Sequence, residues 1–336
     1  MNAESAVHVV GAGGIGVALA VALMRAGRAV VVIDAEESKV RIGRSAGVQI
    51  AGSAALPAPF VAFDDWIPPE RNPILLCTKT FDNPAVLARL PAGANLIPVQ
   101  NGYDPLLEAA GHAGEGIASF VSECARDRPE TRITRPGCLH IGPRRAATRE
   151  DCETLRQLAV SLARGGLFPV EYVDDVRPYK ATKLMYNAAI SPLAAAAGVD
   201  NGELLSDGIA KTLFFALLRE NYAILRHAHV GLARIGPFHP DNVDRILRTP
   251  LLPNLMAVFF RPSLRGTYCS MAPDIGSGRT EIEAYNGHLI RIAGEFPCPI
   301  NRAAEALVQR ISTERLAPDR AHLAFVAAAL PGGRPV

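Results

Sequence analysis

Three polar side chains share one face of an otherwise apolar segment, YKATKLMYNAAISPL. Lys183, Asn187 and Ser191 follow one another at intervals of four residues, so a helix would place them within about 80° of arc. An ammonium, an amide and a hydroxyl in one row could bind an oxygen-rich small molecule. A solvated helix face with a capping network is the alternative interpretation. Pro192 follows directly and is expected to bend the helix.

A glycine-rich turn near the N-terminus has the spacing of a dinucleotide-binding loop. Gly11, Gly13 and Gly16 form G-x-G-x-x-G between a strand-like and a helix-like run, and Gly14 lies inside the turn. Such a loop lets a pyrophosphate approach the backbone at a helix N-terminus. Asp34 ends a second strand-like run roughly 20 residues later, where an acid binds the ribose hydroxyls. The pattern predicts a dinucleotide site, with a βα turn without ligand as the alternative.

Further polar residues follow two other strand-like runs, and two more lie in a later segment. Lys79 comes after ILLCT, and Asn101 comes after NLIPV within Gln-Asn-Gly. The carboxyl ends of strands in an open α/β sheet are where ligands bind, although a surface lysine and an ordinary turn would look the same. Ser270 and Glu281 belong to the segment SMAPDIGSGRTEIE. An acid at a helix start that interacts with the macrodipole is the plain interpretation of Glu281.

These residues need two kinds of scaffold. Residues 7–175 alternate strand-like and helix-like runs, which predicts βαβ units and a mainly parallel sheet. From about residue 178 the pattern is almost entirely helical. We therefore predict an α/β protein with a Rossmann domain over 1–177 and an all-helical domain over 178–336. Within the first domain, 131–143 is expected to form a hairpin or small excursion that turns at Pro136-Gly137.

The expected elements are specific enough to be checked. The strands expected are 7–10, 29–33, 73–78, 95–99, 116–121 and 167–173. The helices expected in the first domain are 14–26, 36–45, 83–89, 104–110 and 149–164. The helices expected in the second domain are 178–197, 206–230, 240–248, 279–294, 299–315 and 317–330.

Composition narrows the partners. The chain has 336 residues, 49% hydrophobic and 20% charged, with a net charge of +2. No basic stripe interleaves with aromatic residues, and no apolar run approaches the ~20 residues of a membrane span, so neither nucleic acid nor a membrane is expected as partner. The six cysteines form no C-x-x-C and no zinc spacing with histidine. We expect no metal, reduced thiols and a cytoplasmic protein.

Taken together, the segments resemble the ketopantoate reductase family (2-dehydropantoate 2-reductases) nearly end to end. The matching motifs, in the family's order, are GAGGIG, CTKT, QNG, KLMYNAAISPL and SMAPDIGSGRTEIEAYNG. The resemblance implies a Rossmann domain, a helical domain, an active site in the cleft between them, and a role in pantothenate biosynthesis. It implies NAD(P)H as cofactor and a small 2-oxo acid as substrate, with a homodimer as one option for the assembly.

The resemblance also implies roles for individual residues. Lys183 is the general acid and Glu281 is the carboxylate of the catalytic site, while Lys79 lies near the nicotinamide. The polar contacts to substrate are Asn101, Asn187, Ser191 and Ser270, and Asn101 also borders the cofactor. The chemistry is consistent with these roles, because a lysine is protonated at neutral pH and its charge stabilises the alkoxide that forms when a 2-oxo acid takes a hydride.

Two positions depart from the family pattern. Ser191 replaces the usual asparagine, which shortens one substrate contact. Asp34 is followed by Ala35, where the family usually has an arginine that binds the 2′-phosphate of NADPH. A carboxylate there accepts hydrogen bonds from ribose hydroxyls and repels a phosphate. We therefore predict a preference for NAD(H), with NADP(H) as the family-typical alternative and Lys39 and Arg41 as the nearby cations that could offset Asp34.

Three functions are compatible with this pattern. The first is the reduction of ketopantoate to pantoate. The second is a family relative that acts on a different oxo or hydroxy acid, which Ser191 and Asp34 favour. The third is a dinucleotide-binding regulator without turnover, and the presence of both Lys183 and Glu281 argues against it.

Overall fold

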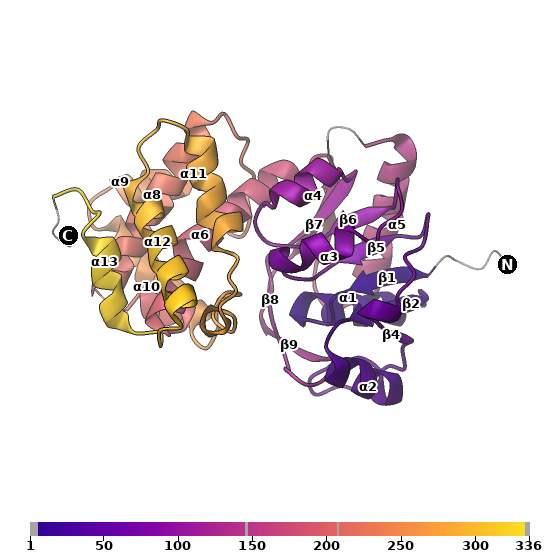
Figure 1. Ribbon diagram of the computed structural model, residues 1–336. Helices are drawn as coiled ribbons and strands as arrows, with labels where there is room; N and C mark the ends of the chain where they lie inside the picture. Colours follow the sequence, from indigo (N-terminus) through magenta and orange to yellow (C-terminus); the bar gives the residue numbers. More distant parts are fainter. Residues whose placement is uncertain (1–5, 145–146, 207, 333–336) are drawn as a thin grey trace. The chain divides into compact units, whose positions relative to one another are not determined.

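The computed structural model describes residues 6–144, 147–206 and 208–332, and Figure 1 shows the arrangement of its elements. Contacts between residues divide the chain into two compact units. The first comprises Met1–Gln100 and Asp104–Val176, and the second comprises Asn101–Tyr103 and Arg177–Val336. The tripeptide Asn101–Tyr103 thus interrupts the first unit in sequence but belongs to the second by its contacts.

Five parallel strands form the central sheet of the first unit, in the spatial order β4-β2-β1-β5-β6. The strands are β1 (Val7–Val10), β2 (Val30–Asp34), β4 (Phe60–Ala62), β5 (Ile74–Leu76) and β6 (Leu96–Pro98). The helices are α1 (Gly14–Arg25), α2 (Glu37–Ala46), α3 (Asn83–Leu87), α4 (Pro105–Ala110) and α5 (Arg149–Arg164). The third-second-first-fourth-fifth order is that of a Rossmann sheet, so the predicted fold class is confirmed.

Helices cover both faces of this sheet. Successive residues of a strand point to opposite faces, so neighbouring residues pack against different helices. Val9 and Leu75 pack into one apolar cluster together with residues of α1 and α5. The next residue along each strand, Val10 and Leu76, packs into a second cluster with Trp66 and residues of α3 and α4. Strands that are buried on both faces read as continuous apolar runs, which explains why VHVV and ILL were recognisable in the sequence.

Two smaller sheets complete the first unit. Strand β7 (Gly114–Ala118) pairs antiparallel with β10 (Leu139–Pro143), which pairs parallel with β11 (Val170–Tyr172). Strand β9 (Glu130–Arg135) pairs with β3 (Gln49–Ile50) and with β8 (Val121–Cys124). The expected hairpin over 131–143 is therefore wrong, because β9 and β10 belong to different sheets. The Pro136-Gly137 segment carries the chain from one sheet to the other.

The second unit is built from helices packed around one apolar core. Its α-helices are α6 (Arg177–Ala197), α7 (Asn201–Leu204), α8 (Gly208–His227), α9 (Pro240–Arg248), α10 (Leu252–Leu264), α11 (His288–Ala293), α12 (Pro299–Glu314) and α13 (Leu323–Ala327). Helices α6, α8 and α12 contact one another, and α11 and α13 pack against α8 and α12 (Figure 1). Among the described residues, none of the helices combines the length and apolarity needed to cross a membrane.

The second unit differs from the predicted elements in four places, one of which is the short helix α7, which was not expected. The single helix expected over 279–294 is a π-helical turn, Glu283–Gly287, followed by α11. The helix expected over 317–330 is a 3-10 turn, Arg320–His322, followed by the short helix α13. Helix α10 was not predicted, because its segment LPNLMAVFFRPSL is apolar around most of its circumference and contains two prolines.

Candidate active site

The glycine turn of the first unit is tightly packed on one side and open on the other. Gly11 has φ +101°, a conformation that side-chain-bearing residues rarely adopt. A Cβ atom at Gly16 would collide with the carbonyl oxygen of Gly11, so this glycine lets the turn and α1 pack closely. A Cβ at Gly13 would meet nothing within 4 Å. The turn is therefore closed toward the protein at Gly11 and Gly16 and open at Gly13, which fits the approach of a pyrophosphate.

The N-terminus of α1 is suited to an anion. The helix begins at Gly14, and its N-cap residue Gly13 provides no side-chain hydrogen bond to the first turn. The first N–H groups of a helix have no partner within the helix and carry the positive end of its dipole. At Gly14, a Cβ would lie 2.5 Å from the Ser122 carbonyl oxygen, so a side chain cannot be accommodated here either. These observations fit the predicted pyrophosphate position.

Asp34 holds the glycine turn against the end of β2. Its Oδ2 accepts a hydrogen bond from Ala12 N at 2.6 Å, and its Oδ1 accepts one from Glu36 N at 2.8 Å. The Lys39 ammonium donates to the Ala12 carbonyl oxygen at 3.1 Å. A carboxylate and an ammonium thus lie beside the same turn. Of the two cations considered in the sequence, Lys39 does reach back to the glycine turn.

The segments after β5 and β6 are joined by buried amides. The Gln100 amide donates to the Thr78 carbonyl oxygen at 2.8 Å and to Asn83 Oδ1 at 2.8 Å. Asn83 is fully buried and donates in turn to Asp104 Oδ2 at 2.6 Å. Lys79 directly follows Thr78, which itself approaches Gly11 closely. The network therefore fixes the backbone from which Lys79 extends, at the carboxyl edge of the sheet.

Helix α6 carries the polar row predicted from the sequence. Lys183 and Asn187 are partly exposed, whereas Ser191 is only 3% exposed. The Ser191 carbonyl oxygen accepts a hydrogen bond from the Cys269 thiol at 3.6 Å. Cys269 directly precedes Ser270, so the end of the row lies next to a second segment that contains a predicted substrate contact.

Pro192 leaves one carbonyl of α6 without its usual helical donor, and a distant side chain replaces that donor. Proline has no N–H, so the carbonyl four residues earlier, that of Ala188, lacks its intrahelical bond. This oxygen accepts a hydrogen bond from Asn286 Nδ2 at 3.0 Å. The same Nδ2 donates to Asn301 Oδ1 at 2.9 Å. Helix α6 remains one continuous element through Pro192, and it is tied there to the π-helical turn.

Two predicted substrate contacts meet at a tyrosine. The Tyr285 hydroxyl lies 2.9 Å from Ser270 Oγ, and it also forms a hydrogen bond with the Asn101 side chain. Burial raises the pKa of Tyr285 well above its ordinary value, and the negative charge of Glu281 raises it further. Glu281 is itself 3% exposed and directly precedes the helical segment that leads into the π turn. The helical unit therefore joins Asn101 and Ser270 at one buried phenol, which also feels the negative charge of Glu281.

Tyr285 and Asn286 were not identified as site residues from the sequence. Tyr285 falls with Ile282 and Leu289 at helical spacing, which is typical of a core residue. Asn286 precedes a glycine and resembles an ordinary polar residue of a helix end. The available signal was the polar sequence Tyr-Asn-Gly within an apolar repeat, close behind the acid Glu281. Side chains at positions 285 and 286 are both fully buried in the π turn.

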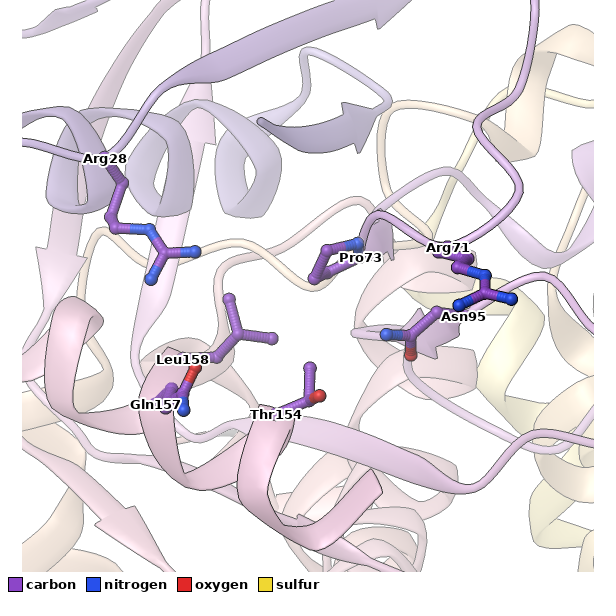
Figure 2. A pocket seen from close by; sticks show the side chains of 7 residues that line it. All are labelled: Arg28, Arg71, Pro73, Asn95, Thr154, Gln157 and Leu158. Carbon is purple, nitrogen blue, oxygen red and sulfur yellow. The ribbon is translucent and has the colours of Figure 1, made fainter. Parts of the chain in front are cut away.

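Other polar clusters of the first unit lie apart from these residues in sequence. A cavity of about 100 Å³ is lined by Arg28, Arg71, Pro73, Asn95, Thr154, Gln157 and Leu158 (Figure 2). Pro73 directly precedes β5 and Asn95 directly precedes β6, so the cavity lies at the amino ends of these strands. Ligands of open α/β sheets bind at the opposite, carboxyl ends. The cavity is also too small for a dinucleotide.

Two groups with metal-ligand side chains are brought together by the fold, although sequence spacing showed neither. One contains Glu108, His112 and Glu115, and Arg144 balances its charge by an ion pair of 2.6 Å with Glu108. The other contains Cys138, His140 and Glu171. Its carboxylate side chain is 58% exposed and lies 3.4 Å from the His140 ring. Neither group includes a residue of the glycine turn or of α6.

A Rossmann unit with a glycine turn that is open at Gly13, joined in one chain to a helical unit whose helix α6 carries Lys183 in a polar row, is the architecture of an NAD(P)-dependent oxidoreductase. Family profiles identify which one. The profile described as ketopantoate reductase PanE/ApbA matches residues 7–145, and that of its C-terminal domain matches residues 175–312. The chain belongs to the ketopantoate reductase family, whose members are oxidoreductases that act on a CH–OH group.

Individual relatives are similar at a distance. A 2-dehydropantoate 2-reductase from Aquifex aeolicus is 25% identical over 299 residues, which cover 86% of this chain and 90% of the relative. A ketopantoate reductase structure from Ralstonia eutropha has a TM-score of 0.73 at 22% identity, covering 93% of this chain and all of that one. D-mandelate dehydrogenase, in a ternary structure with NADH and anilino(oxo)acetate, has a TM-score of 0.74 at 16% identity over 93% of this chain and all of that one.

Proposed function

We propose that the protein reduces a small 2-oxo acid, 2-dehydropantoate (ketopantoate) in the first place, to the corresponding 2-hydroxy acid with NAD(P)H. The observation that carries this proposal is the set of polar side chains that the helical unit contains. It combines a lysine and an amide on the exposed part of α6 with a buried glutamate and the Asn101–Ser270 pair. Such a set can donate a proton, stabilise an alkoxide and bind a carboxylate, which is what reduction of a 2-oxo acid requires.

In this proposal the residues divide the work as follows. Bound nicotinamide supplies the hydride, and the residues that would hold the dinucleotide are Gly11, Gly13, Gly14, Gly16, Asp34 and Lys79. Lys183 gives its proton to the oxygen at C2, and its charge stabilises that oxygen as it becomes negative. Glu281 orients the ammonium. The polar groups that hold the substrate are those of Asn101, Asn187, Ser191 and Ser270.

A panel of substrates tests the reaction. NADH and NADPH would each be mixed with ketopantoate and with other 2-oxo acids, and oxidation would be followed by loss of cofactor fluorescence. We expect turnover with ketopantoate at the highest kcat/KM. Turnover only with another acid would replace ketopantoate while keeping the reaction class. Cofactor binding without oxidation of any kind would support a non-catalytic regulator and contradict the proposal.

A different 2-oxo acid is the second candidate, and one residue favours it. Ser191 stands where the family usually has an asparagine, so one substrate contact is shorter. Relatives do differ in substrate, since D-mandelate dehydrogenase shares the fold of this chain. Replacing Ser191 by asparagine should raise kcat/KM for ketopantoate relative to the other acids if the shorter side chain sets the preference.

We further propose that NADH is preferred over NADPH. The Asp34 carboxylate lies beside the glycine turn, and the position after it, Ala35, has no cationic side chain. A carboxylate there can accept hydrogen bonds from ribose hydroxyls and repels a 2′-phosphate. The Lys39 ammonium near Ala12 works in the opposite direction and limits the preference. The ratio of kcat/KM for the two cofactors measures the balance of these charges.

The assembly we propose is a homodimer formed through α10. Large apolar side chains are exposed along one face of this helix and the residue before it, namely Leu251, Leu255, Val258 and Phe259, with Phe259 70% exposed. Contiguous exposed apolar groups of this kind mark interaction surfaces. A structural neighbour from Staphylococcus aureus is described as a dimeric ketopantoate reductase. Phe259→Ser should shift the sedimentation coefficient from dimer to monomer, whereas an unchanged dimer would exclude this face.

The compartment we propose is the cytoplasm. All six cysteines are free thiols in the structure. Burial raises the pKa of Cys138 to about 11, so this thiol stays protonated at neutral pH and is a poor nucleophile.

A further inference from the structure

Each of the three residues of the tripeptide Asn101–Tyr103 contacts the π turn of the helical unit. The Asn101 side chain bonds to the Tyr285 hydroxyl. Gly102 packs on the Tyr285 ring so closely that a Cβ would lie 2.7 Å from Cδ1, and its φ of +76° also favours glycine. The backbone N–H of Tyr103 donates to the Ala284 carbonyl oxygen at 2.9 Å. The π turn therefore binds the tripeptide through both a side chain and the backbone.

The far end of the tripeptide is held by two more side chains. The Lys180 ammonium lies 4.6 Å from the centroid of the Tyr103 ring. The His288 ring stacks on Tyr103 with centroids 4.2 Å apart and planes at 10°. Lys180 is 3% exposed, so the cation–π contact is made out of water, where it is strong. Asn101 consequently extends from a segment whose backbone has little freedom to move.

The hydroxyl of Tyr285 joins this segment to the loop before the π turn. It contacts Ser270 Oγ at 2.9 Å while it bonds to Asn101. The ring is fully buried, and the phenol has one O–H to donate and lone pairs with which to accept. The Tyr285 hydroxyl oxygen therefore fixes the direction of the Asn101 amide and that of the Ser270 hydroxyl, although these residues are 169 positions apart in the chain.

We propose that Tyr285 is a positioning residue for substrate binding, which acts by holding the side chains of Asn101 and Ser270 in the orientation that the 2-oxo acid requires. The inference rests on the proposed function for the identity of the ligand. It predicts that loss of the hydroxyl alone weakens the binding of the acid and leaves the cofactor site of the Rossmann unit unaffected. A purely structural role predicts a change in stability without this selectivity.

The test compares two matched variants, Tyr285→Phe and Tyr222→Phe. The second removes an equivalent hydroxyl in the same unit, which donates to Asp241 at 3.0 Å and, among the residues that the structure describes, forms no hydrogen bond with a candidate site residue. We expect Tyr285→Phe to raise KM for the oxo acid about 10-fold or more, with a smaller fall in kcat and a change in Kd for NADH well below the change in KM. Tyr222→Phe should leave all three constants within about two-fold.

Crystal structures of the two variants separate this inference from the proposed reaction. In Tyr285→Phe, the Asn101 and Ser270 side chains should take new rotamers, while Tyr222→Phe should keep both as they are. If Tyr285→Phe keeps both rotamers, or keeps KM within two-fold of the wild type, the positioning role is wrong. If instead the wild type oxidises NADH with none of the acids, the proposed function fails, and the rotamers still decide whether Tyr285 orients the pair.

Discussion

Gly13 offers the sharpest test of the cofactor site, because the fold tolerates a side chain there and the ligand should not. Its backbone has φ −85° and ψ −170°, an extended conformation that valine adopts readily. A Cβ at this position meets nothing within 4 Å. Gly13→Val should therefore change the free energy of unfolding by less than about 1 kcal/mol.

The effect on the cofactor should be much larger. The branched side chain would occupy the open space beside the first N–H groups of α1, where the pyrophosphate must approach. Hydrogen bonds to a charged group contribute about 1.5–3 kcal/mol each. Loss of one or two of them corresponds to about 3 kcal/mol, or about 150-fold in Kd.

Calorimetric titration of NADH into the variant and wild type measures this difference, and thermal unfolding measures the change in stability. Gly208→Val is the control, because Gly208, like Gly13, has nothing within 4 Å of its Cβ but begins α8 in the other unit. A Gly13→Val protein that binds NADH as tightly as the wild type would refute the assignment of the glycine turn. A variant that unfolds instead would refute the claim that this side of the turn is open.

Three further outcomes are expected. Lys183→Ala should lower kcat by about 10²–10³-fold or more, because it removes both the proton donor and a charge that stabilises the alkoxide, while the Kd for NADH stays the same. Asp34→Asn should raise kcat/KM for NADPH about 10-fold, since one negative charge is removed from beside the glycine turn. Burial lowers the pKa of His8, whose Nδ1 accepts a hydrogen bond from Trp66 at 3.0 Å. Because the unfolded chain takes up this proton at a higher pH than the folded protein, the free energy of unfolding should fall as the pH drops below about 6.5.

Each of these expectations has a matched control. Lys211→Ala removes a lysine of the same unit that donates to Asn254 at 2.9 Å, and it should leave kcat unchanged. Glu37→Gln removes an exposed charge from α2 and should change the cofactor ratio less than Asp34→Asn does. His8→Gln should flatten the pH dependence of unfolding. Normal turnover without Lys183, an unaltered ratio in Asp34→Asn, or an equally steep pH profile without His8 would contradict the respective reasoning.

The sequence was most informative where a local pattern determines a local structure. Helix 149–164 was predicted with the bounds that α5 has, and it begins with a capping box in which Thr148 and Asp151 exchange hydrogen bonds. The segment Pro240–Arg248 was also predicted with its observed bounds. In both segments apolar residues recur at helical spacing between clear start and stop signals, so tertiary contacts were not needed to recognise them.

Features that depend on distant parts of the chain were not predictable. Pro136-Gly137 looks like a hairpin turn, but the strands on either side find partners in other sheets. The π turn cannot be read from apolar spacing, because its extra residue is accommodated through contacts such as that of Asn286 with the Ala188 carbonyl. Likewise, nothing local to Gln-Asn-Gly indicates that Asn101 joins the helical unit.

The hydrogen bond between Tyr103 N–H and the Ala284 carbonyl oxygen has a consequence for synthesis on the ribosome. All five strands of the parallel sheet are complete once residue 98 has emerged, but the partner of Tyr103 lies 181 residues further along the chain. At translation rates of about 5–20 residues per second, roughly 10 to 40 seconds separate the two events. During that interval the nascent Rossmann unit presents the loop after β6 without its permanent contacts. We therefore expect this loop to be cleaved more readily by a protease in an unfinished chain than in a finished one.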